Sequence, residues 1–179
     1  MTPLSIKVNI LVDQERHARL ADFGLLTIIS DHTNFTNSSS VSIGGTIRWM
    51  SPELLHPEQF GSKYGRPTKA SDCYALGMVI LEVLTAQRPF TACGTHVVML
   101  KVTDGERPGR PDGARGMWFT DDLWKMLGLC WAQDAQNRPS IEAVRECLER
   151  VSSTWEPLPP QVNKGGGDGD DWHFTVLTV

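Results

Sequence analysis

Asn9 and Asp22 carry side-chain oxygen atoms of the kind that hard divalent cations such as Mg²⁺ prefer as ligands. Asn9 lies in the apolar, β-branched run 8–12, and Asp22 is followed by Phe and Gly. Residues 13–16 are typical of a turn and 17–21 alternate weakly in polarity, so the pattern predicts a hairpin of two short strands. Such a hairpin would bring the two residues to one end of a small sheet. An Asp-Phe-Gly triplet by itself is weak evidence for a metal site, because it is common in loops.

The elements that must position these residues are mainly helical. The strongest signal covers residues 71–85, which are apolar on nearly every face and therefore predict a helix buried at the centre of its domain. Ser71 or Asp72 could cap its N-terminus. Amphipathic helices are predicted over 96–102, 121–131 and 141–151, the last two capped by Thr120 and Ser140.

The remaining segments read as loops and short elements. Residues 25–29 could add a third short strand, and 51–55 a brief helical turn. Residues rich in Ser, Thr, Asn, Gly and Pro predict loops over 30–45, 57–70 and 105–116. We expect order to fall from residue 152 onward, and residues 172–179 to be a frayed terminus rather than a strand.

Composition restricts the class of protein. The chain has 179 residues, 40% of them hydrophobic, and a net charge of −4, which is typical of one globular domain. It has no basic stripe for nucleic acid, no secretory leader, and no apolar run long enough to span a bilayer. The four cysteines form no C-x-x-C pair, and Cys73, Cys130 and Cys147 lie in apolar helical patterns. We therefore expect reduced core thiols in a cytoplasmic or nuclear protein without nucleic-acid or membrane partners.

A second block, Gly-Thr-Ile-Arg-Trp-Met-Ser-Pro-Glu at 45–53, follows the Asp-Phe-Gly triplet. Further along the chain, matching blocks occur in the expected order at 71–77, 88–90, 130–131 and 137–140. Together with Asn-Ile-Leu-Val at 9–12, these blocks resemble the C-terminal lobe of a protein kinase domain. The pattern is most similar to the tyrosine-kinase-like group of Ser/Thr kinases.

The resemblance implies a mainly α fold with a small β-hairpin, which is the C-terminal lobe of the α+β protein kinase fold, with the N-terminal lobe absent. On this interpretation residues 8–151 are a partial kinase domain. Residues 1–7 are a leader that does not match, and 152–179 are a flexible tail rich in Pro, Gly and Asp.

The resemblance also implies ATP and Mg²⁺ as cofactors, with Asn9 and Asp22 as the metal ligands. Phe23 would pack against an N-terminal lobe, and Thr46 favours Ser or Thr over Tyr as the phosphate acceptor. The implied activation-segment residues are Phe23, Gly24, Thr46, Trp49 and Pro52.

Several implied roles are structural. Glu53 and Arg138 would form a buried ion pair that ties the activation segment to the base of the lobe. Asp72 would accept backbone N–H groups of the catalytic loop, and Gly77 belongs to the start of the central helix. Trp49 and Trp131 are expected only to fill core space.

Four serines lie inside the implied activation loop and are candidate phosphorylation sites, namely Ser38, Ser39, Ser40 and Ser42. Arg16, Arg19 and Arg48 could pair with a phosphate there. The alternative is a serine-rich loop without modification.

The implied catalytic machinery is incomplete. The family's catalytic loop reads His-x-Asp-x-x-x-x-Asn, and counting back from Asn9 puts the base at Leu4, which cannot accept a proton. No Gly-rich loop and no Val-Ala-Ile-Lys strand precede it. The helix that normally covers the central helix is also absent, so a face among Leu76, Val79, Ile80 and Val83 should be partly bare.

Three readings follow. The family function is transfer of phosphate from ATP to Ser or Thr of a protein substrate, and we expect this isolated chain to be inactive. The first alternative is a pseudokinase-like lobe that binds a partner protein without catalysis. The second is a gene fragment without function.

Overall fold

The computed structural model describes residues 4–7, 10–13, 15, 17–20 and 47–155. These residues fall into two compact units, the first with the described residues up to 20 and the second with those from 47 to 155. The predicted strand at 25–29, the loop at 30–45 and the tail beyond 155 lie outside the described residues.

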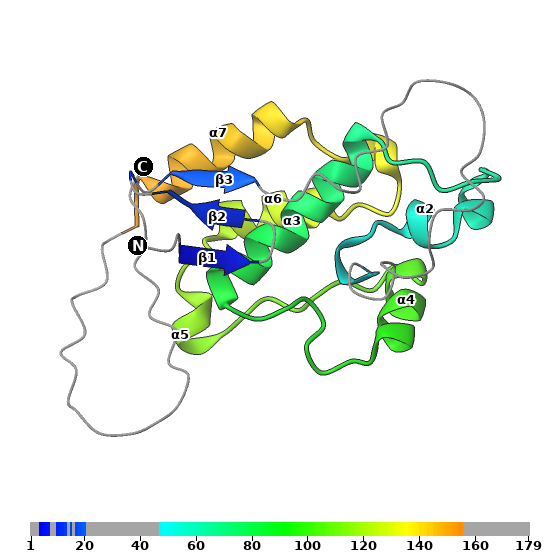
Figure 1. Cartoon of the computed structure of the whole chain (residues 1–179), viewed down its shortest axis with the longest axis horizontal. Coiled ribbons are helices and arrows are strands. Elements are labelled where there is room, and N and C mark those ends of the chain that lie inside the picture. The colour runs from blue at the N-terminus through cyan, green and yellow to red at the C-terminus, as the bar shows by residue number, and fades with distance from the viewer. Residues whose placement is uncertain (1–3, 8–9, 14, 16, 21–46, 156–179) are drawn as a thin grey trace. The chain divides into compact units, whose positions relative to one another are not determined.

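The first unit is a three-stranded antiparallel sheet of β1 (Leu4–Lys7), β2 (Ile10–Val12) and β3 (Ala18–Leu20), in the order β1-β2-β3 (Figure 1). The predicted hairpin is confirmed by the pairing of β2 with β3. Strand β1, which lies within the expected leader 1–7, was not predicted. Its sequence nevertheless alternates between apolar and polar residues, which is the period of a strand.

Asp13 organises the turn between β2 and β3. Its Oδ1 accepts the backbone N–H of Glu15 at 3.0 Å and of His17 at 2.8 Å. Its Oδ2 accepts the Arg19 Nε–H at 2.8 Å. These bonds, the backbone bond to His17 above all, lower the pKa of the Asp13 carboxyl. An aspartate that satisfies backbone donors in this way fixes a turn.

The second unit is helical. Its long helices are α3 (Lys69–Thr85), α4 (Thr95–Thr103), α6 (Asp121–Cys130) and α7 (Ile141–Ser152). Short helices are η1 (Ile47–Trp49), α2 (Pro52–Leu55), η2 (Pro57–Phe60), α5 (Gly113–Gly116) and η3 (Ala135–Asn137). The predicted helices are therefore present. The expected loops at 57–70 and 105–116 contain η2 and α5.

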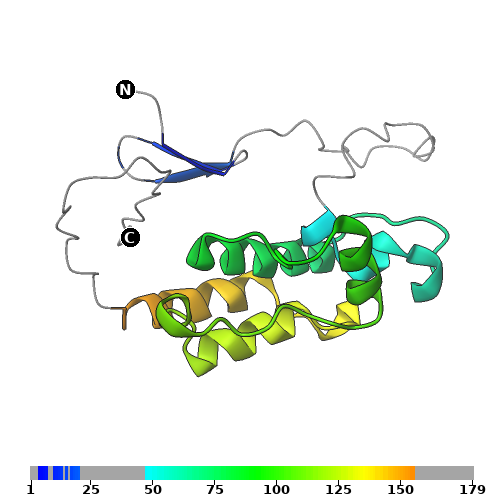
Figure 2. The ribbon, with the colours of Figure 1, turned by 90° about the horizontal axis from the view of Figure 1, so that it is seen from below.

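Helix α3 runs through the middle of this unit, and α6 and α7 lie roughly alongside it in both views (Figures 1 and 2). Its fully buried side chains include Tyr74 and Met78, and α6, which packs against it, contributes the fully buried Leu123 and Leu127. Helices α2 and α4 lie on the side of the N-terminal end of α3. This packing gives the segment from residue 47 to residue 55 a rigid helical support.

The N-terminus of α3 differs from the prediction. The cap is Thr68, whose hydroxyl accepts the Ser71 N–H at 3.1 Å while the Ser71 hydroxyl accepts the Thr68 N–H at 2.8 Å. Ser71 is thus the reciprocal partner in a capping box rather than the cap. Asp72 lies exposed in the first turn, where its negative charge favours the helix dipole. The predicted caps Thr120 and Ser140 are confirmed.

One face of α3 is less covered than the rest. Leu76, Val79 and Val83 are only partly buried, whereas Ile80 is 8% exposed and belongs to the core. The expectation of a partly bare face somewhere among these four residues thus agrees with the partial burial of the first three. Within the described residues no helix is long and apolar enough to cross a bilayer.

The cysteines behave as expected of reduced core thiols. Cys73, Cys130 and Cys147 are free and buried, each at most 2% exposed, and Cys93 is free and partly exposed. Burial raises the pKa of the Cys73 and Cys130 thiols, which keeps them protonated and unreactive.

Candidate functional site

The Glu53–Arg138 ion pair links the start of α2 to the segment before α7. Arg138 Nη1 and Nη2 donate to the two carboxylate oxygens of Glu53 at 2.7 and 2.8 Å, an end-on bidentate geometry. The Arg138 side chain is fully buried and the Glu53 side chain is 17% exposed. The pair implied by the sequence is therefore present, although its partners are separated by 85 residues.

The Arg138 guanidinium donates further hydrogen bonds to backbone carbonyls. Nη1 also donates to the Ala70 carbonyl at 3.0 Å, and Nε donates to the Ala132 carbonyl at 2.9 Å. Burial by itself would raise the pKa of Glu53, but the bonds from Arg138 and neighbouring groups outweigh it, so this pKa lies below its ordinary value. Arg138 thus joins α2, the first turn of α3 and the η3 region at one point.

Tyr74 lies between two arginines in this region. The guanidinium of Arg138 lies 5.2 Å from the centroid of its ring and that of Arg107 lies 5.4 Å away. The ring is fully buried, and burial raises the pKa of its hydroxyl to about 12. A neutral phenol ring at this position stabilises both cations through its π face.

Trp49 has a role that the sequence did not predict. Its indole Nε1–H donates to Glu82 Oε2 at 3.0 Å, and Glu82 is a buried carboxylate in α3, 3% exposed. The expectation that Trp49 only fills space is therefore wrong, because a buried carboxylate requires donors and the indole supplies one. Trp131 does fill core space, at 2% exposure.

Arg48 is also engaged in a way that differs from its expected role as a phosphate partner. Its Nη1 donates to the carbonyls of Pro89 and Phe90 at 3.0 and 2.6 Å, and its Nη2 to that of Cys93 at 2.6 Å. Since three backbone carbonyls already occupy this guanidinium, Arg48 positions a loop. Arg19, a second expected phosphate partner, is paired with Asp13 at 2.8 Å.

Gly77 is required by close packing in α3. A Cβ built at this position would lie 2.6 Å from Trp131 Nε1 and 3.0 Å from Cys130 Cβ. The absence of a side chain therefore lets α3 approach the end of α6.

In the sheet unit, Leu4, the residue at the implied catalytic-base position, lies in β1 and pairs with Val12 of β2. Ile10 of β2 pairs with Leu20 of β3, so the chain enters β2 and leaves β3 at the same end of the sheet. Asn9 directly precedes β2 and Asp22 follows β3 by two residues. Both residues lie outside the described ones, so their expected juxtaposition stays a prediction.

Three potential metal ligands do gather in the described residues, at the turn between β2 and β3. Ligand atoms of Asp13, Glu15 and His17 lie within 4.8 Å of one another; Asp13 is partly buried, and Glu15 and His17 are exposed. The Asp13 oxygens already accept three hydrogen bonds that shape the turn. We therefore interpret this cluster as a structural turn.

Several predicted site residues lie outside the described part of the chain. They are the expected metal ligands, part of the expected activation segment, the four serines and one arginine, namely Asn9, Asp22, Phe23, Gly24, Thr46, Ser38, Ser39, Ser40, Ser42 and Arg16. Pro52 is described and begins α2 as a fully buried residue. The bond expected from Asp72 to the catalytic loop would join the two units and stays a prediction.

Comparison with known proteins agrees with this geometry. The family model described as protein tyrosine and serine/threonine kinase matches residues 6–148. The serine/threonine-protein kinase mos of Patiria pectinifera is 31% identical over 165 residues, covering 89% of this chain and 43% of that protein. Receptor-interacting serine/threonine-protein kinase 3 of Rattus norvegicus is 31% identical over 157 residues, covering 82% and 30%.

The chain thus spans less than half the length of these relatives, and it covers only 8% and 7% of two serine/threonine-protein kinase/receptor relatives from Acanthamoeba polyphaga mimivirus. The matched residues include the segment that holds Trp49 and Glu53 and the loop that holds Arg138. The chain therefore belongs to the protein tyrosine and serine/threonine kinase family.

Proposed function

We propose that this chain is the C-terminal, substrate-binding lobe of a kinase domain of the tyrosine-kinase-like group, which acts on Ser or Thr of a protein substrate. The observation that carries the proposal is the Glu53–Arg138 pair, which fixes the end of the activation segment to the helical body. Trp49 and Arg48 add two further attachments to the same segment. A segment attached at three points is preorganised to present a substrate chain in one conformation.

The proposed cofactors are ATP and Mg²⁺. Asn9 and Asp22 supply an amide and a carboxylate oxygen, which suits a hard cation, and in the sequence they directly precede β2 and follow β3 by two residues. Bound Mg²⁺ would neutralise charge that develops on phosphate oxygens. Thr46 supports the choice of Ser or Thr over Tyr.

We further propose that this chain by itself does not transfer phosphate. Leu4 stands at the position of the catalytic base, and an aliphatic side chain can neither accept a proton nor orient a hydroxyl. Its place in β1, with a partner in β2, also gives the backbone an extended conformation there. This observation favours the second candidate function, a lobe that binds a partner protein without catalysis.

A paired assay on the full chain tests both parts. Arrayed peptides that differ only by Ser or Tyr at one position measure binding, and radiolabelled ATP with Mg²⁺ measures transfer. We expect preferential retention of Ser peptides and no labelling. If the chain labels a peptide and Asp22→Asn abolishes the labelling, the proposal that the chain is inactive is disproved. Equal retention of the Ser and Tyr peptides would disprove the proposed specificity.

A further inference from the structure

Two buried thiols from different helices meet in the helical unit. Cys73 lies near the start of α3 and is 1% exposed, and Cys130 is the last residue of α6 and is 0% exposed. The Cys130 thiol donates a hydrogen bond to the Cys73 sulfur. The two sulfur atoms are therefore neighbours, although neither residue takes part in the site described above.

The backbones that carry these thiols also approach closely. Gly77 lies one helical turn after Cys73, on the same face of α3. A Cβ built at Gly77 would lie only 3.0 Å from the Cβ of Cys130. A disulfide requires Cβ atoms about 3.5–4.5 Å apart and Cα atoms about 4.4–6.8 Å apart. The contact between the thiols and the close packing of α3 on the end of α6 together bring this pair near that geometry.

Arg138 joins the same two segments without a covalent bond. Its Nη1 donates to the carbonyl of Ala70, three residues before Cys73, at 3.0 Å. Its Nε donates to the carbonyl of Ala132, two residues after Cys130, at 2.9 Å. A bond between the two sulfur atoms would therefore hold together the segments that Arg138 holds beside Glu53.

The two thiols are not equivalent. Burial raises the pKa of both. The hydrogen bond between them opposes this rise at Cys73 and adds to it at Cys130, and the charge of Arg138 also favours the thiolate of Cys73. Cys73 is therefore the first of the pair to ionise, and the thiolate is the form that reacts with oxidants.

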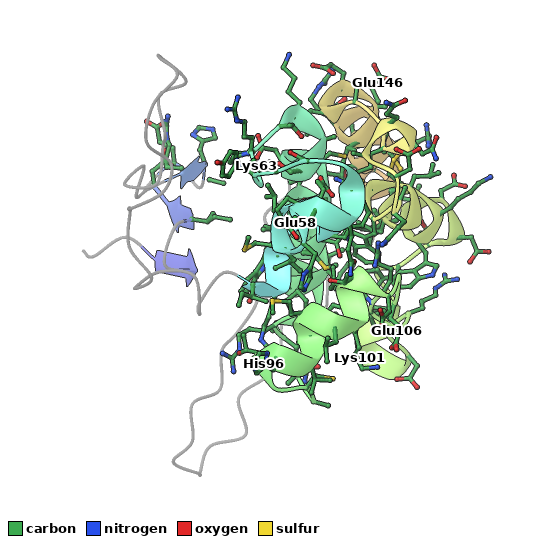
Figure 3. The ribbon with its side chains drawn as sticks, turned by 90° about the vertical axis from the view of Figure 1, so that its right-hand side faces the viewer. Glu58, Lys63, His96, Lys101, Glu106 and Glu146 are labelled. Atoms are coloured by element: carbon green, nitrogen blue, oxygen red, sulfur yellow. The ribbon has the colours of Figure 1, made fainter. Side chains whose placement is uncertain are left out.

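The third buried thiol lies elsewhere along α6. The Cys147 sulfur lies 4.0 Å from the carbonyl oxygen of Asp122, near the start of α6, whereas Cys130 ends that helix. Glu146, directly before Cys147 on α7, is exposed and points out of the helical unit (Figure 3). Cys147 is thus a matched control for the pair, because it is equally buried in the same unit.

We propose that Cys73 and Cys130 form a reversible disulfide, with a peroxide as oxidant, and that this bond reinforces the contact held by Arg138. The Cys73 thiolate attacks one oxygen of hydrogen peroxide and the O–O bond breaks. The departing hydroxide takes up the proton that the thiol released, which gives a sulfenic acid and water. The Cys130 sulfur then attacks the Cys73 sulfur, the S–O bond breaks, and the hydroxyl group leaves as water with the Cys130 proton.

The two thiols thus lose two electrons and two protons, and hydrogen peroxide becomes two molecules of water. A thiol reductant such as glutathione reverses the bond by exchange. Because both sulfur atoms are buried, oxidation and reduction require a transient opening at the end of α6 and are slow in the closed core. The proposal does not depend on phosphoryl transfer.

Thiol counting on the full chain tests the bond. The chain is treated with hydrogen peroxide, and the remaining thiols are blocked with N-ethylmaleimide in denaturant. We expect two of the four thiols to remain free and tryptic mapping to link the peptide of Cys73 to that of Cys130. Cys73→Ser and Cys130→Ser should each abolish this link, whereas Cys147→Ser retains it.

A second treatment covers slow opening of the core. Oxidised glutathione in mild urea gives the buried thiols repeated access to an oxidant while the folded state stays populated. The same link is expected after this treatment. Free Cys73 and Cys130 after both treatments, or a link that joins either of them to Cys93 or Cys147, would overturn the proposal.

Thermal unfolding tests the relation to Arg138. The oxidised chain should unfold at a midpoint about 5–15 °C above that of the reduced chain. Arg138→Met should lower this midpoint less in the oxidised chain than in the reduced one, and folding of this variant only when oxidised is the limiting case. Val144→Ala, at a fully buried position of α7, is the control and should lower both midpoints equally. An equal loss for Arg138→Met in both states would show that the disulfide does not reinforce this contact.

Discussion

The Trp49 indole donates to the Glu82 carboxylate at 3.0 Å, across 33 residues of sequence. This bond connects the segment before α2 to the last turn of the central helix α3. Because Glu82 is only 3% exposed, its carboxylate depends on protein donors rather than on water. The segment before α2 is therefore attached to the core by a polar contact as well as by packing.

Replacing Trp49 by Phe should destabilise the helical unit by about 1–3 kcal/mol, because a buried acceptor loses a donor. Urea denaturation monitored by circular dichroism measures the change. Glu82→Gln in the Trp49→Phe background should recover part of the loss, since a neutral amide is less costly to bury than a carboxylate. A Trp49→Phe variant as stable as the wild type would show that the bond contributes nothing.

The Glu53–Arg138 pair should couple strongly in a double-mutant cycle. Removing either partner leaves a buried or half-buried charge, which costs about 3–5 kcal/mol. The double variant Glu53→Gln, Arg138→Met should cost less than the sum of the two single variants. The exposed pair Arg145–Glu149 on α7 is the control and should couple by less than about 1 kcal/mol. Additive losses at Glu53 and Arg138 would contradict this interpretation.

The sequence predicted the long helices and the Glu53–Arg138 pair for different reasons. Thr120 and Ser140 directly precede amphipathic runs, so their capping role could be predicted locally. The ion pair could not be derived from a local pattern, and it followed only from resemblance to a family.

Other features depend on tertiary geometry that no local pattern records. Arg48 binds carbonyls 41 to 45 residues further along, and a sequence gives no sign of which way a guanidinium turns. At α3, Thr68 and Ser71 are both good caps, and only the extended backbone at Thr68 decides between them. The alternation of apolar and polar residues in β1 is a local signal that could have predicted this strand.

The four cysteines should differ sharply in reactivity towards Ellman's reagent. Cys93 is partly exposed, whereas the other three are buried and the pKa values of Cys73 and Cys130 are raised by burial. We expect one thiol per native chain to react quickly, and Cys93→Ser to abolish that phase. Rapid reaction of more than one thiol would mean that the helical core opens readily.

Stability should fall as the pH is lowered through the acid range, partly because of Glu53. Its pKa in the folded chain lies below the ordinary value of 4.5, so the unfolded chain binds the proton first. The stabilisation is therefore complete above about pH 4.5 and is lost as the pH falls through the folded pKa. Asp13 and Glu142 also have lowered pKa values and act in the same range.

Comparison of the wild type with Glu53→Gln isolates the contribution of Glu53 to the pH dependence of stability. The difference in free energy of unfolding between the two should be largest near neutral pH and should shrink below about pH 4.5. A difference that stays constant from pH 7 to pH 3 would show that the charge of Glu53 does not matter.

Gly77→Ala should destabilise the chain although alanine favours helices. The new Cβ would lie 2.6 Å from Trp131 Nε1, so the indole or α3 must shift, at a cost of about 1–3 kcal/mol. The higher helix propensity of alanine relative to glycine offsets about 1 kcal/mol of this cost. Gly128→Ala on α6 is the matched control, because its Cβ would enter open space and should stabilise by up to about 1 kcal/mol. Thermal unfolding of both variants decides: if Gly77→Ala melts as high as Gly128→Ala, the close approach of α3 to Trp131 does not constrain this position.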